Sequence, residues 1–122
     1  MNIESLRLYC LAKPGTTEGF PFGEDTLVFK VMGKLFALTS LDNPVSVNLK
    51  ADPPYSIALR EEYPERIRPG FHMNKTHWNT VSLIDNLPEE LIRSLVDHSY
   101  DMVVKTLKKS EKEQLARLSG QT

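Results

Sequence analysis

The chain has 122 residues, of which 40% are hydrophobic, 25% charged and 8% aromatic. This balance predicts one folded domain over residues 1–122 and excludes a disordered or fibrous protein. Fifteen Lys and Arg against sixteen Asp and Glu leave a net charge of −1, which excludes a strongly basic nucleic-acid coat. The single cysteine, Cys10, cannot form an internal disulfide, and no apolar run is long enough for a membrane span. Because residues 1–13 also lack a signal-peptide pattern, we expect a cytoplasmic protein.

The first part of the chain predicts one helix followed by three antiparallel strands. Residues 2–12 carry apolar side chains at helical spacing, and Pro14-Gly15 ends that helix. Residues 16–24 are rich in Thr, Gly and Pro, which favours an irregular edge segment. Polar and apolar side chains then alternate over three stretches, which are residues 26–32, 35–39 and 45–50. The Gly33-Lys34 pair is typical of a tight hairpin turn between the first two stretches.

The middle of the chain predicts a helix, an irregular segment and a further strand. Asp52 is typical of a helix N-cap, and Pro64 ends that helix. We expect residues 65–77 to be irregular around a turn at Pro69-Gly70. Residues 78–84 are rich in Thr, Val and Ile, which predicts a strand.

The last third predicts two helices. Residues 88–108 carry one apolar stripe at helical spacing, the strongest periodic signal in the sequence. Ser110 and Glu113 have the form of a capping box that begins a short final helix. The resulting order, α-β-β-β-α-β(β)-α-α, is an α+β layout in which helices flank an antiparallel sheet. We expect the helices to cover one sheet face and to leave the other face available for function.

The sequence contains no motif for catalysis or for cofactor binding. The three histidines have no partners at zinc-ligand spacing, so we expect no metal site. No serine lies in a Gly-x-Ser-x-Gly turn, and no glycine-rich loop precedes a helix to cradle phosphates. Cys10 lies on the apolar side of the first helix, where we expect a small buried hydrophobe. We therefore expect neither a cofactor nor an enzymatic activity.

The middle region is the only basic part of the chain, with seven basic and five acidic side chains over residues 30–78. Its cations fall on outward strand positions or beside turns, close in sequence to aromatic residues. Ammonium and guanidinium groups beside flat rings suit a surface that follows a nucleic-acid backbone. The candidate contact residues are Lys30, Lys34, Lys50, Arg68, His72, Lys75 and Trp78. The alternative is an ordinary solvated strand face, with the tryptophan packed under a helix.

An ordered set of short motifs resembles the MmcQ/YjbR family of small bacterial proteins. The motifs are Lys13-Pro14-Gly15, Phe20-Pro21-Phe22-Gly23, residues 29–37, Asn48-Leu49-Lys50, residues 68–81 and Ser99-Tyr100. The resemblance implies an antiparallel sheet flanked by helices, similar to secretion-chaperone-like and frataxin-like arrangements. It also implies DNA binding through two wing-like hairpins, and it supplies no catalytic residues. Lys34, Lys50, His72, Lys75 and Trp78 match signature positions of the family.

Three functional hypotheses remain at this point. The first is non-enzymatic DNA binding through the seven candidate residues and two wing-like hairpins or loops. The second is a protein-interaction or chaperone-like module, homodimeric, that uses the open sheet face or the long helix. The third is a small-ligand pocket around His72, Lys75, Trp78 and Tyr100. Within the long helix, we expect the Ser99 hydroxyl to bond to its own helix backbone and Tyr100 to reach a loop.

Overall fold

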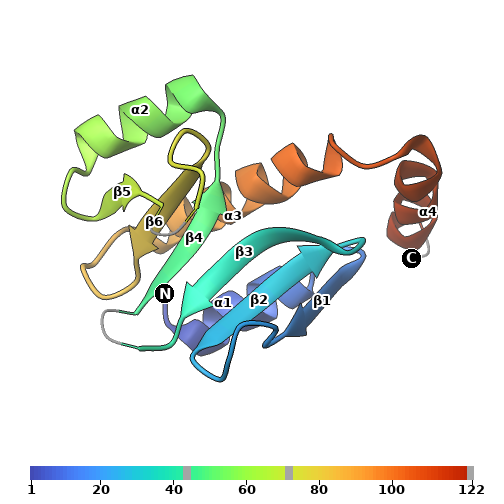
Figure 1. The fold of residues 1–122 in the computed structure, drawn as a ribbon, viewed down its shortest axis with the longest axis horizontal. Helices are drawn as coiled ribbons and strands as arrows, with labels where there is room; N and C mark the ends of the chain where they lie inside the picture. The colour runs from blue at the N-terminus through green and yellow to red at the C-terminus, as the bar shows by residue number, and fades with distance from the viewer. Residues whose placement is uncertain (43–44, 71–72, 121–122) are drawn as a thin grey trace.

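A computed structural model describes residues 1–42, 45–70 and 73–120 of the protein. Four helices and six strands follow one another as α1 (Ile3–Leu11), β1 (Thr16–Gly19), β2 (Thr26–Val31), β3 (Lys34–Ser40), β4 (Ser46–Lys50), α2 (Pro53–Glu62), β5 (Ile67–Pro69), β6 (Trp78–Ser82), α3 (Glu89–Val104) and α4 (Lys109–Ser119). The strands form one antiparallel sheet in the order β1-β2-β3-β4-β6-β5 (Figure 1). The predicted α+β class, an antiparallel sheet flanked by helices, is confirmed.

The β2–β3 hairpin follows from the alternating pattern of its two strands. Leu27, Phe29 and Val31 are buried on one side of β2, as the alternation over residues 26–32 indicates. The turn between the strands lies at Met32 and Gly33, whose φ angles are 49° and 84°. Two consecutive positive φ angles make a type I′ turn, which matches the twist of an antiparallel pair. The turn therefore lies one residue before the predicted Gly33-Lys34 pair, and Lys34 is the first residue of β3.

Helices α1, α2 and α3 all cover the same face of the sheet. Helix α3 packs across β2, β3 and β4, whereas α1 lies on β1 and α2 lies on β5. In Figure 1, α1 and α3 lie behind the sheet. The core between these helices and the sheet contains the largest fully buried side chains, among them Phe29, Phe36, Leu6, Ile67 and Ile92. The apolar stripe predicted over residues 88–108 supplies the α3 side of this core.

The Ser99 hydroxyl of α3 joins two neighbouring strands. The β2–β3 register shifts between Phe29 and Lys30, which leaves Phe36 as an extra residue in β3. Ser99 Oγ donates to the Phe36 carbonyl at 2.6 Å and accepts from the Lys50 N–H at 2.8 Å. The expectation that Ser99 bonds to its own helix is therefore wrong, because the irregularity in β3 offers it unpaired groups of the sheet. Tyr100 reaches a loop as expected, since its hydroxyl donates to the Pro14 carbonyl at 2.5 Å.

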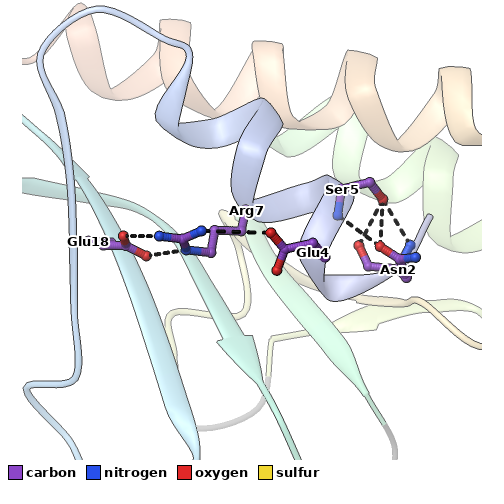
Figure 2. Close-up of polar contacts among 5 residues, drawn as sticks. All are labelled: Asn2, Glu4, Ser5, Arg7 and Glu18. Atoms are coloured by element: carbon purple, nitrogen blue, oxygen red, sulfur yellow. Dashed lines mark hydrogen bonds and ion pairs between the residues drawn. The ribbon is translucent and has the colours of Figure 1, made fainter.

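Helix α1 is fixed at its N-terminus and near its middle, as Figure 2 shows. At its N-terminus, Asn2 and Ser5 exchange hydrogen bonds in a capping box. Farther along, Arg7 makes a two-pronged contact with Glu18 of β1, at 2.8 and 2.7 Å. The Arg7–Glu18 contact attaches the first helix to the edge strand of the sheet.

A buried polar cluster attaches α2 to the other side of the sheet. Asn79 of β6 donates to the Ser56 hydroxyl at 3.0 Å and accepts from Arg60 Nε at 2.7 Å. Ser56 and Asn79 are both buried. Asp52 is the N-cap residue of α2, as predicted, although its side chain makes no capping hydrogen bond.

Three further expectations are corrected by the structure. The segment predicted to be irregular over residues 65–77 contains the short edge strand β5. Residues 16–24 lie at the sheet edge, as predicted, but they begin with a regular strand, β1. Both are short, and β5 ends in proline, so neither gives a clear alternating pattern. The final helix begins at Lys109 rather than after Ser110. The Glu111 side chain caps the N-terminus of α4, because it accepts a hydrogen bond from the Lys108 N–H at 2.9 Å.

Helix α4 lies beyond the end of α3 and packs against the turn region of the first hairpin (Figure 1). Leu115 is its buried residue, 6% exposed. A Cβ atom at Gly15 would lie 2.8 Å from Leu115 Cδ1 and 3.2 Å from Met32 Sδ. The last helix, the α1–β1 loop and the β2–β3 turn therefore meet around Gly15.

None of the described helices is long and apolar enough to cross a membrane.

Candidate nucleic-acid interface and open sheet face

The sheet face opposite the helices, here called the open face, carries its side chains in three transverse rows. The registers pair Lys30 with Leu35 and Lys50 with Trp78 in the first row. The second row contains Val28, Leu38, Asn48, Thr80 and Arg68. The third row contains Thr26, Ser40, Ser46 and Ser82. Because side chains alternate along a strand, each of these residues points away from the helices that cover the other face.

Three of the predicted contact residues come together in the first row. Lys30, Lys50 and Trp78 are all half-buried on the open face. Trp78 faces away from α2, because its neighbour Asn79 bonds to that helix. The alternative that the tryptophan is packed under a helix is therefore wrong. Arg68 belongs to the next row, opposite Thr80, and its Nε donates to the Glu65 carbonyl at 3.1 Å.

The other predicted contact residues lie elsewhere. Lys34 extends toward the end of α3, where its ammonium donates to the Thr106 carbonyl at 2.9 Å. The structure thus places Lys34 away from the open face, because the exposed carbonyls at a helix C-terminus attract a cation. Lys75 is exposed in the β5–β6 loop, and its carbonyl accepts from Arg60. His72 lies outside the described residues.

The ligand pocket expected around His72, Lys75, Trp78 and Tyr100 is not formed. Tyr100 lies on the helix-covered side of the sheet, where its ring meets Phe36 edge to face at a centroid distance of 5.3 Å. Trp78 lies on the opposite side. The sheet itself therefore separates two of the four side chains of that hypothesis.

The two segments expected as wings lie at the same end of the sheet. Strand β2 ends at Val31, which pairs with Lys34, and β4 ends at Lys50, which pairs with Trp78. The Met32–Gly33 turn and the loop from Gly70 to Trp78 therefore both extend from this end. The end of α3 and helix α4 lie on the same side of the molecule as the β2–β3 turn (Figure 1).

All nine lysines of the chain lie at this end, here called the lysine end. Three belong to strands that begin or end there, one to the β5–β6 loop, one to the end of α1, and four to the end of α3 and to α4. They are Lys13, Lys30, Lys34, Lys50, Lys75, Lys105, Lys108, Lys109 and Lys112. The acidic side chains at the same end are Asp52, Asp101, Glu111 and Glu113, together with Asp97, whose carboxylate pairs with Lys13. The lysine end is thus positively charged, although the chain as a whole carries −1.

The opposite end of the sheet carries most of the negative charge and is here called the acidic end. Its carboxylates belong to the β1–β2 loop, the β3–β4 loop, the end of α2 and the loop after it, the β6–α3 connection and the start of α3. They are Glu24, Asp25, Asp42, Glu61, Glu62, Glu65, Asp85, Glu89 and Glu90. The near-neutral net charge therefore results from two ends of opposite sign rather than from evenly mixed charges.

A hollow of about 830 Å³ occupies the middle of the open face. Residues from five of the six strands line it, and the β1–β2 and β5–β6 loops contribute Phe22 and Met73. Its lining is largely apolar and includes Leu35 and Leu38 of β3. Polar side chains of β4 and β6 interrupt this apolar lining, and Arg66, Arg68, Glu65 and Asp85 stand around it.

The sequence interpretation missed the residues that shape this hollow. Asn48 is 6% exposed and Ser46 is 7% exposed, and both lie on the side of β4 that faces the hollow. The clean alternation of residues 45–50 placed them on the outward side. A buried asparagine on the outward side of a strand is the signal that this side is partly enclosed rather than fully solvated.

The titratable groups with shifted pKa values lie on the helix-covered side of the molecule. Burial raises the pKa of Cys10 to about 12, which makes this thiol unreactive at neutral pH. Burial, together with a hydrogen bond to Asp97, raises the pKa of Tyr9 to about 12. Burial acts to raise the pKa of Asp97, but hydrogen bonds from Lys13 and Tyr9 outweigh it and hold this pKa below its ordinary value. These groups join α1 to α3 and do not line the open face.

Within residues 1–42, 45–70 and 73–120, no three His, Cys, Asp or Glu side chains are placed to hold a metal ion.

Comparison with known proteins identifies the family. Residues 11–102 match the YjbR family model. The chain is 36% identical to the uncharacterised protein YjbR of Escherichia coli K12, over 97% of this chain and all of that protein. It is 37% identical to Escherichia coli YbdF over 92% of each chain. A crystal structure from Deinococcus radiodurans, described as a DUF419 domain, superposes with a TM-score of 0.87 at 40% identity, covering 94% and 88% of the two chains. The chain therefore belongs to the YjbR family, as its sequence motifs indicated.

Proposed function

We propose that the protein is a non-enzymatic binder of nucleic acid and that the lysine end is its contact surface. The observation that carries this proposal is the position of all nine lysines at one end of the sheet. Binding to a phosphate backbone depends on the local density of cations, which release condensed counterions, rather than on total protein charge. A net charge of −1 therefore does not oppose binding at this end.

The first row of the open face supplies the part of the surface closest to a bound strand. Lys30 and Lys50 provide two ammonium groups for phosphates, and the half-buried Trp78 provides a ring on which a base can stack. The β2–β3 turn and the β5–β6 loop flank this row at the same end of the sheet. Phosphate contacts of this kind carry little sequence information, so we expect weak sequence preference.

The experiment is a titration of fluorescently labelled 20-mer DNA, duplex and single-stranded, at several salt concentrations. We expect the logarithm of the binding constant to fall linearly with the logarithm of salt concentration. Lys30→Gln with Lys50→Gln should weaken binding about tenfold at low salt and reduce the salt slope by about 2. Trp78→Ala should weaken single-strand binding more than duplex binding, because only unpaired bases can stack on the ring.

Arg93→Gln is the matched control for these charge changes. Arg93 is exposed on α3, and its ion pair at 3.7 Å is with Glu89 near the acidic end. This variant should bind like the unaltered protein. The proposal would be contradicted if neither duplex nor single-stranded DNA bound at low salt. It would also be contradicted if the Arg93 variant lost as much DNA affinity as the lysine variants.

A protein-interaction role has one specific observation in its favour. Four large apolar side chains are well exposed in loops at the acidic end: Phe20, Phe22, Leu41 and Ile84. Exposed apolar groups with a polar surround are typical of protein contact surfaces. Light scattering over a range of protein concentrations tests self-association directly, and Phe22→Ser should lower the mass if this end joins two copies.

A further inference from the structure

The hollow on the open face has hydrogen-bond donors that the protein leaves unused. Asn48 Oδ1 accepts from the Thr80 hydroxyl at 2.6 Å. Among the described residues, no acceptor lies within hydrogen-bond distance of the Asn48 side-chain amide group, although this residue is 94% buried. The Asn48 amide nitrogen is not one of the fully enclosed unpartnered side-chain atoms among the described residues, so it keeps some contact with solvent. The donor lies on the wall of the hollow, so a molecule within the hollow can accept from it.

Arg68 supplies a second donor in the same row. Asn48 pairs with Thr80, and Thr80 pairs with Arg68, so Asn48 and Arg68 are two strands apart. This spacing corresponds to about 10 Å between their backbones. Arg68 bonds to the Glu65 carbonyl through Nε alone, which leaves both terminal nitrogens of its guanidinium without a partner in the described part of the chain. These nitrogens and the Asn48 amide border one polar corner of the hollow.

The rest of the hollow is suited to an apolar group. Leu35 and Leu38 of β3 line it, and Phe22 and Met73 line it from loops at opposite ends of the sheet. A volume of about 830 Å³ lies within the range of small-molecule sites, roughly 300–1,000 Å³. The shape and lining thus fit an amphipathic molecule with one group that accepts hydrogen bonds.

We propose that this hollow binds a small organic carboxylate. The carboxylate would accept from the Arg68 guanidinium and from the Asn48 amide, and an aromatic or branched body would lie on Leu35 and Leu38. The two arginines around the hollow are balanced by Glu65 and Asp85, so a monoanion meets less net repulsion there than a dianion does. Asp85 accepts from the Ser82 hydroxyl at 2.7 Å, and Arg66 donates to the Asp85 carbonyl at 3.5 Å, so Arg68 is the cation free to bind the ligand. A dianionic phosphate would bring more negative charge than one arginine neutralises.

The test is an NMR titration of the full chain with phenylacetate, using labelled asparagine side chains and leucine methyl groups. We expect saturable shifts of the Asn48 side-chain amide and of the Leu35 and Leu38 methyls, with a dissociation constant of the order of 1 mM for a ligand of this size. Phenylacetamide, which lacks the charge, should bind about tenfold more weakly. Phenyl phosphate should also bind more weakly than phenylacetate, and tighter binding of the phosphate would overturn the assignment of a carboxylate.

Arg68→Gln should weaken phenylacetate about tenfold, and Arg93→Gln should leave its affinity unchanged. Arg68 is exposed, so this substitution does not endanger the fold. Absence of saturable shifts at Asn48, or equal affinity in the Arg68 variant, would overturn the proposal. The NMR readout does not involve DNA. The two proposals can therefore fail separately: carboxylate binding in the hollow can be absent while DNA binding at the lysine end is present, or DNA binding can be absent while carboxylate binding is present.

Discussion

A single hydroxyl, that of Ser99, supports the irregular junction between β3 and β4. It bonds to Phe36 and Lys50 of two different strands and is fully buried. Ser99→Ala leaves a carbonyl and an N–H unpaired in the interior, so we expect it to lower the free energy of unfolding by about 1–3 kcal/mol. Urea denaturation measures this loss.

Ser94→Ala is the matched control for Ser99. Ser94 is on the same helix but is exposed, and its hydroxyl donates to the Leu91 carbonyl of its own helix at 2.8 Å. We expect this variant to change stability by no more than about 0.5 kcal/mol. Equal effects of the two substitutions would show that the bridge between the strands contributes nothing.

Asp97 gives stability a defined dependence on pH. Its carboxylate receives hydrogen bonds from Tyr9 at 2.6 Å and Lys13 at 2.5 Å, which hold its pKa below the ordinary value despite burial. The unfolded chain therefore binds this proton more readily than the folded protein. The resulting stabilisation is present above the ordinary aspartate pKa, about 3.9, and is lost as the pH falls below it.

Asp97→Asn removes this contribution. Urea unfolding should show the variant to be less stable than the unaltered protein at pH 6, with a smaller difference at pH 3. Asp101→Asn, on the same helix, serves as control, since Asp101 makes no ion pair among the residues that the structure describes. A difference between Asp97→Asn and the unaltered protein that does not change with pH would contradict this account.

At the scale of elements, Gly15 is the point where the last helix meets the first hairpin. Its φ is +71°, and a Cβ atom there would approach Leu115 Cδ1 to 2.8 Å. Gly15→Ala combines left-handed strain with overpacking, so we expect a loss of about 2 kcal/mol or more in the free energy of unfolding. Gly19→Ala is the control, because nothing lies within 4 Å of its Cβ position, and it should be neutral or slightly stabilising. A similar loss in both variants would exclude the contact with α4 as the cause.

The elements differ in how far their sequence predicts them. Strands β2 to β4 are predicted because each carries enough alternating residues to show its buried side. Strand β5 has three residues, ends in proline and pairs on one side alone, so its pairing with β6 depends on tertiary structure rather than on local pattern. The position of Lys34 could not be predicted either, since its partner Thr106 is 72 residues away.

At the scale of the whole molecule, the separation of charge predicts that DNA affinity depends more on where a charged side chain lies than on the net charge of the protein. The strands that join the two ends have five to seven residues, which corresponds to about 17–23 Å. At 0.15 M salt, charges farther apart than about 8 Å are largely screened. Glu61→Gln with Glu62→Gln raises the formal net charge from −1 to +1, yet it should change DNA affinity by less than about twofold. An increase as large as the loss in the Lys30 and Lys50 variants would show that the total charge controls binding.

The candidate surface could be predicted only in part. Alternation alone places Lys30 and Lys50 on one side of their strands, and the structure confirms that placement. Counting charges along the sequence identifies a basic middle region but cannot show that all nine lysines lie together, because that requires the direction of every strand and helix. The hollow was missed for the same reason, since its lining comes from five strands. Contact of these residues with DNA stays a prediction.

The buried thiol of Cys10 provides a built-in reporter of local opening. The side chain is completely enclosed between α1 and the sheet, so a maleimide or disulfide reagent can reach it only while the first helix is lifted away. The fraction of time spent in that state sets the rate of modification when reclosing is fast. Kinetics of alkylation in native buffer would therefore measure how often the helix separates, without adding a label or changing a residue.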